Sequence, residues 1–198
     1  MTNQHHVLTA TGPSGVWLRV SFVWWVDRFG HVISVARAGK HPIAVLHSIE
    51  GDAQDAWPAS PPLQSVSVEK VAEYRPAALL VGMAGQSHWS ASIEAVRGRA
   101  ALVFDVACRL GGLPGDLSSR YSVEAGQIVS GPGDKQREYV EIHTDGPPVR
   151  IYRESVPEGE VKLRLPEPGE LVIRPGVITA KPNATVRWKY RLEVAETS

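Results

Sequence analysis

The sequence lacks several features that would point directly to a function. Its 198 residues include a single cysteine, Cys108, so no disulfide can form within the chain. Its longest apolar run is far shorter than the ~20 residues that a membrane helix needs, and residues 1–13 lack the basic start and apolar core of a signal peptide. The formal net charge is zero, whereas proteins that bind nucleic acids are usually basic. We therefore expect a cytoplasmic protein that binds neither a membrane nor a nucleic acid.

What the sequence has instead is many turn residues between short alternating segments. Its 18 glycines and 15 prolines are scattered along the chain, a distribution typical of many short strands. We predict an all-β chain with at most one or two short helices, folded as an antiparallel β-sandwich of jelly-roll type. Residues 1–15 are expected to be a flexible N-terminal segment. Residues 16–195 are expected to be a single domain, with one possible sub-boundary near residues 131–134.

Two-residue alternation identifies the predicted core strands. Residues 16–25, 102–110 and 185–194 each place an apolar side chain at every second position. Because successive side chains on a strand point to opposite faces, one face of each segment is predicted to pack on the core. A turn is expected at residues 27–30. Cys108 lies on the apolar face of its strand, and we interpret it as a small buried hydrophobic residue.

The middle of the chain allows two interpretations. Residues 89–96 alternate as a strand does, and Arg97-Gly98-Arg99 would link them to the next strand. The same residues have apolar positions at spacings of four and three, which fit one helical face. We favour the strand. A helix would make the glycine-rich residues 82–88 a strand–loop–helix unit and favour a hydrolase, although they match neither a phosphate loop nor a nucleophile elbow. The continuous apolar residues 77–81 predict a strand buried on both faces.

The sharpest candidate for chemistry is the alternating set Glu141, His143 and Asp145. On a strand these side chains share one face, and their oxygen and nitrogen donors suit a divalent metal or general acid–base catalysis. A metal would need further ligands, for which His47 and His88 are candidates. This set defines the alternative prediction, a small metal-dependent or acid–base enzyme. A solvated strand face is the simpler interpretation.

An acidic loop is expected after the strand near residues 43–49. Glu50, Asp52 and Asp55 present oxygen atoms of the kind that calcium prefers, but their spacing matches no defined calcium loop. We interpret this segment as a solvated loop.

Tryptophan is the remaining candidate for function. Of the six tryptophans, Trp17, Trp25 and Trp57 occupy positions where complete burial is awkward. Exposed flat rings are a common means of holding sugar rings or apolar ligands. Since we find no catalytic or cofactor motif, we expect a non-catalytic ligand-binding or protein-interaction module. Its partner would be a small molecule, a glycan or a protein, and a second copy of this chain is one such protein.

Overall fold

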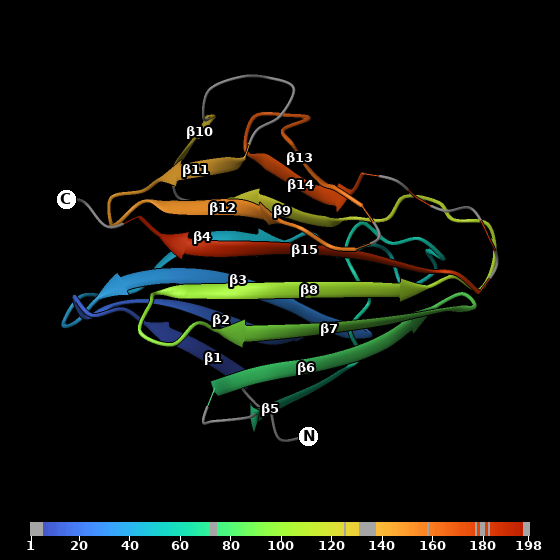
Figure 1. Cartoon of the computed structure of the whole chain (residues 1–198), viewed down its shortest axis with the longest axis horizontal. Helices are drawn as coiled ribbons and strands as arrows, with labels where there is room; N and C mark the ends of the chain where they lie inside the picture. Colours follow the sequence, from blue (N-terminus) through green and yellow to red (C-terminus); the bar gives the residue numbers. More distant parts are fainter. Residues whose placement is uncertain are drawn as a thin grey trace.

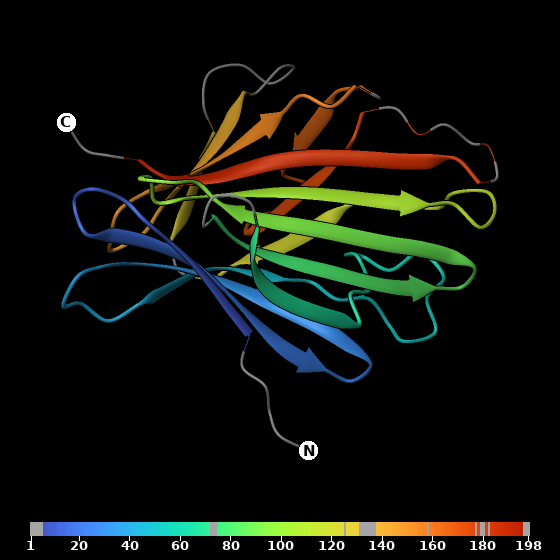
Figure 2. The same ribbon diagram turned by 60° about the horizontal axis from the view of Figure 1, so that its bottom comes forward.

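The structure, a computed structural model, describes residues 6–71, 75–124, 126–130, 138–157, 159–176, 178, 181 and 183–195. Within these ranges it contains fifteen strands and no helix. The strands form two antiparallel sheets that pack face to face, as Figures 1 and 2 show from two directions. The prediction of an all-β sandwich is confirmed, and residues 89–95 belong to a strand rather than a helix.

The two sheets differ in size by one strand. The first contains, in spatial order, β1 (His6–Thr11), β2 (Val16–Trp25), β3 (Arg28–Arg37), β4 (Ile43–Ser48), β9 (Ser119–Val123), β14 (Glu170–Pro175) and β13 (Val161–Arg164). The second contains β10 (Gln127–Ser130), β11 (Tyr139–His143), β12 (Val149–Glu154), β15 (Thr185–Val194), β8 (Ala101–Arg109), β7 (Ser87–Ala95), β6 (Arg75–Ala84) and β5 (Ser65–Val71).

The predicted alternation of β2, β8 and β15 is confirmed by burial. β8 and β15 lie side by side at the centre of the second sheet, and their alternate side chains point into the core. Phe104 of β8 stacks on Tyr190 of β15 with ring centres 4.9 Å apart. Cys108 is fully buried, and burial raises the pKa of its thiol to about 12. The thiol is therefore protonated and unreactive at neutral pH.

The predicted N-terminal boundary is wrong for residues 6–11. These residues form β1, which pairs with β2 from His6 opposite Phe22 to Thr11 opposite Trp17. Leu8 and Ala10 of β1 are buried in the core, so this short segment gains enough apolar contact to join the sheet. The possible sub-boundary near residues 131–134 lies outside the described residues.

The turn predicted at residues 27–30 is also displaced. The turn consists of Val26 and Asp27, and Arg28, Phe29 and Gly30 already belong to β3. Val26 has a φ of 57°, a conformation that valine rarely adopts. The sequence pattern missed this turn because valine is not a turn residue.

Candidate functional site

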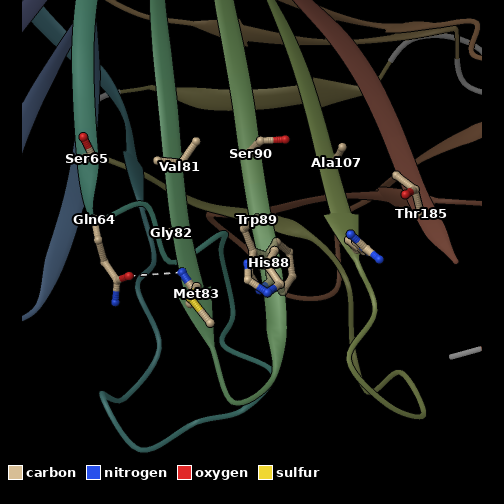
Figure 3. Close-up of a pocket in the computed structure, with 11 residues that line it drawn as sticks. Gln64, Ser65, Val81, Gly82, Met83, His88, Trp89, Ser90, Ala107 and Thr185 are labelled. Carbon is tan, nitrogen blue, oxygen red and sulfur yellow. Dashed lines mark hydrogen bonds between the residues drawn. The ribbon is translucent and has the colours of Figure 1, made fainter. Parts of the chain in front are cut away.

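The outer face of the second sheet carries a hollow of about 580 Å³ over β6, β7 and β8 (Figure 3). Backbone pairing aligns two rows of side chains across these strands, Met83–His88–Arg109 and Val81–Ser90–Ala107. Ser90 and Ala107 have short side chains, and longer ones stand beside them on the neighbouring strands. The hollow therefore follows from residue size and strand register.

β6 supplies an apolar wall to this hollow. Val81 and Met83 are 55% and 46% exposed. The prediction of a strand buried on both faces is wrong here, because β6 buries Ala78 and Leu80 on its inner face but exposes Val81 on its outer face. Exposed apolar side chains grouped on one face often mark a binding surface.

The chain that leads into β5 fixes the position of this wall. The Gln64 backbone N–H donates to the Val81 carbonyl oxygen at 2.8 Å, and the Met83 N–H donates to Gln64 Oε1 at 3.0 Å (Figure 3). A Cβ atom on Gly82 would lie 1.8 Å from the Pro62 carbonyl oxygen. Glycine is therefore required where the two segments cross.

The opposite side of the hollow carries the positive charge of Arg109. His88 and Arg109 line it, and none of its lining residues is a carboxylate. Arg109 is exposed and makes no ion pair with any residue that the structure describes. By contrast, Arg187 on the adjacent β15 donates to Asp105 Oδ1 at 2.6 Å. Arg109 is thus available to an anion from outside, for which a guanidinium is a strong hydrogen-bonding partner.

A smaller hollow of about 330 Å³ lies next to the first along β7 and β8. Its lining includes the acidic residues Glu94 and Asp105 together with the basic residues Arg97 and Lys189. The two carboxylates balance the two cations, so this lining has no net positive charge to favour an anion. The charge distribution therefore favours an anionic group in the larger hollow, near Arg109.

A separate group of polar side chains is sealed inside the sandwich. His31 Nε2 lies 2.9 Å from the Tyr121 hydroxyl, which lies 2.6 Å from the Tyr190 hydroxyl. Burial lowers the pKa of His31 to about 4 and raises the pKa of Tyr190 to about 12. All three groups are buried and uncharged at neutral pH. We assign them a structural role, because a substrate cannot reach them.

Glu50 lies at the edge of this buried group. Burial raises the pKa of its carboxyl to about 7, while a hydrogen bond from Ser48 and the nearby Arg28 act in the opposite direction. A carboxyl of this kind can exchange protons near neutral pH. Within the described ranges, however, the side chain hydrogen-bonded to Glu50 is that of Ser48. The Ser48 hydroxyl accepts a hydrogen bond from the backbone N–H of His31 and is hydrogen-bonded to no basic side chain among the described residues. These residues do not form an acid–base pair suited to catalysis.

The structure does not bring the three predicted tryptophans together. Trp17 and Trp25 lie at opposite ends of β2, about 26 Å apart at ~3.3 Å per residue. The guanidinium of Arg19 covers the Trp17 ring at 4.4 Å. Trp57 packs edge-on against the buried Trp89, with ring centres 6.5 Å apart. Of the three, Trp25 is the one with a largely exposed ring.

The predicted metal-binding residues are likewise dispersed. His143 Nε2 lies 2.5 Å from Glu141 Oε1 on β11, and Asp145 follows in the next turn. His47 lies on β4 in the other sheet, and His88 lines the hollow. Among the described residues, no group of three histidine, cysteine or acidic side chains is placed to hold a metal ion.

Sequence reasoning missed most of the residues that form the hollow. The sequence pattern points to His88 as a metal ligand and to residues 82–88 as a glycine-rich turn, but it indicates neither Gln64 nor Arg109 as a site residue. The parity of β8 does predict that Arg109 faces outward. What the sequence does not specify is the register that brings Arg109 beside His88 and Met83.

No helix in the described part of the chain is long and apolar enough to cross a membrane. No protein-family model matches the chain, and no match is found among the curated proteins compared with it.

Proposed function

We propose that this chain is a non-catalytic binding module whose hollow over β6–β8 binds an amphipathic anion, a ligand with an apolar body and one carboxylate or similar group. The observation that carries the proposal is the exposed Arg109, unpaired among the described residues, across from the exposed Val81 and Met83. The ligand's apolar body would cover the β6 wall. Its anionic group would accept charge-assisted hydrogen bonds from the guanidinium.

The size and lining of the hollow support a small ligand. Its volume of about 580 Å³ falls within the ~300–1,000 Å³ usual for such sites. Among its described lining residues, no tryptophan or tyrosine ring is exposed, because Trp89 is buried in the core beneath β7. A flat platform for a sugar ring is therefore missing there, which favours an acyl or aromatic acid over a glycan.

Methionine gives a direct test of this proposal. The chain has two methionines, Met1 and Met83, so labelling with [methyl-¹³C]methionine places one of two reporters in the hollow. On titration with octanoate we expect a saturable shift of the Met83 methyl resonance and no shift of Met1. Octylammonium, which has the same chain length and the opposite charge, should bind more weakly.

Matched arginine variants complete the experiment. Arg109→Gln should weaken octanoate binding about tenfold, because it removes a charge-assisted bond. Arg37→Gln, an exposed position on the other sheet, should leave it unchanged. The proposal fails if Met83 does not respond saturably, or if octanoate and octylammonium bind equally well.

A further inference from the structure

The turn between β2 and β3 exposes four consecutive apolar side chains, those of residues 23–26. Trp25 is 63% exposed and Val26 is 75% exposed. Two-residue turns with positive φ normally hold glycine, asparagine or aspartate, and a β-branched residue at a φ of 57° is strained. Neither core packing nor turn stability accounts for a valine at this position, which points to a role in binding.

The tip is held in a fixed position by the residues beneath it. Trp24 packs edge-on against Phe29, with ring centres 4.9 Å apart. Arg28 is 1% exposed and donates to the Asp27 carboxylate at 2.8 and 2.9 Å. It also donates to the carbonyl oxygen of Asp52 at 3.3 Å. The tip and the loop at residues 49–64 therefore meet at one end of the sandwich (Figure 2).

The loop brings net negative charge to this end, because Arg28 interacts electrostatically with Asp27, Glu50 and Asp55 and its single charge cannot balance all of these carboxylates. Asp52 and Asp55 are exposed, and neither makes an ion pair within the described part of the chain. The Asp52 backbone N–H donates to the Asp55 carboxylate at 3.0 Å, which orders the loop. Residues 41–69 contain no lysine and no arginine. Asp27, in contrast, is neutralised by the buried Arg28.

We infer that residues 23–26 together with Asp52 and Asp55 form a docking surface for a cationic polypeptide segment, one that carries arginine or lysine side chains. A guanidinium or ammonium group binds the face of an exposed tryptophan, and the neighbouring carboxylates complement its charge. The same carboxylates repel an anionic lipid surface, which disfavours a membrane as the occupant. The hollow over β6–β8 has the opposite charge preference, so the two surfaces bind different partners.

The test mixes the 198-residue chain with a capped octa-arginine peptide. Calorimetry measures the binding affinity, and the tryptophan indole N–H resonances report which tryptophans are contacted. Trp25→Ala should weaken binding at least tenfold. Asp52→Asn with Asp55→Asn should do the same, since asparagine keeps the oxygen acceptors of the loop and removes only its charge. Binding should weaken further as salt is added, because the charges are exposed.

Three controls decide the outcome. Trp17→Ala and Asp145→Asn, which lie away from the tip, should leave peptide binding unchanged, and Trp25→Ala should leave octanoate binding unchanged. The inference is overturned if octa-arginine does not bind, or if Asp145→Asn weakens it as much as the loop variant does. It is also overturned if the chain binds phosphatidylcholine–phosphatidylserine vesicles through Trp25 but does not bind the peptide.

Discussion

His31 is a histidine kept neutral by the interior of the sandwich. It lies between Phe22 and Phe104, and its ring nitrogen is hydrogen-bonded to the Tyr121 hydroxyl. Burial lowers its pKa from 6.5 to about 4. Between these two values the unfolded chain binds a proton that the folded chain does not, so acid favours unfolding. Glu50 has the opposite effect, because its pKa rises from 4.5 to about 7 on folding.

The two effects can be separated by pH titration of stability. In Glu50→Gln the free energy of unfolding should rise by about 3 kcal/mol between pH 4 and 6.5, as His31 loses its proton in the unfolded state. In the wild type the rise in the free energy of unfolding should be smaller between pH 4.5 and 6.5. Over that range Glu50 becomes ionised in the unfolded chain while it stays largely protonated in the folded chain, which favours unfolding as the pH rises. Urea unfolding at several pH values measures both.

The double variant His31→Phe, Glu50→Gln is the control for this prediction. Its free energy of unfolding should change little between pH 4 and 6.5. If that free energy rises with pH as steeply as it does in Glu50→Gln, then His31 is not the group responsible.

At the scale of the element, the β2–β3 hairpin carries a stability cost at its tip. Val26 is in the left-handed region with a φ of 57°, a conformation that asparagine tolerates better. We expect Val26→Asn to raise the free energy of unfolding by about 1 kcal/mol. Val23→Asn, at an exposed strand position of ordinary φ, should give no gain. A loss of stability in Val26→Asn would show that the valine is stabilising.

The sequence predicts a strand correctly where one face of the strand is buried and the other is exposed to solvent. β2, β8 and β15 were predicted because alternation is then imposed by the core. The prediction fails at β6, where continuous apolar residues indicate burial on both faces while the outer face is exposed. It also fails at β1, a strand of six residues in which Leu8 and Ala10 are the buried ones, too few to establish an alternating pattern.

The candidate site was less predictable than the strands. A hollow depends on which residues stand opposite one another, and pairing registers are set by contacts distant in sequence. Residues 81–83 and 107–109 form one surface because β7 lies between them. The acidic loop was visible in the sequence, but its contact with the β2–β3 tip depends on Arg28, which the predicted turn had placed outside a strand.

At the scale of the whole molecule, each sheet combines strands from both halves of the chain, the first half being β1–β8 and the second half β9–β15. β1–β4 join β9, β14 and β13 in the first sheet, and β5–β8 join β15, β12, β11 and β10 in the second. Side chains of the two halves also contact one another at these seams. His31 Nε2 of β3 lies 2.9 Å from the Tyr121 hydroxyl of β9, and Trp188 of β15 packs edge-on against Trp89 of β7 with ring centres 6.1 Å apart. One hydrophobic core includes residues of both halves.

This arrangement predicts that the two halves unfold together. Trp188 is fully buried at the seam, so Trp188→Phe should lower the free energy of unfolding by about 2 kcal/mol through a small cavity and a lost hydrogen bond to Ser119 Oγ. The Met83 methyl resonance reports on the first half and the His143 ring on the second, and both should shift to the same lower midpoint in urea. Trp25→Phe, at an exposed position, should leave the midpoint unchanged. If His143 loses its native signal while Met83 keeps its own, the seam does not couple the halves, and the chain consists of two units that share a sheet edge without sharing a folding transition.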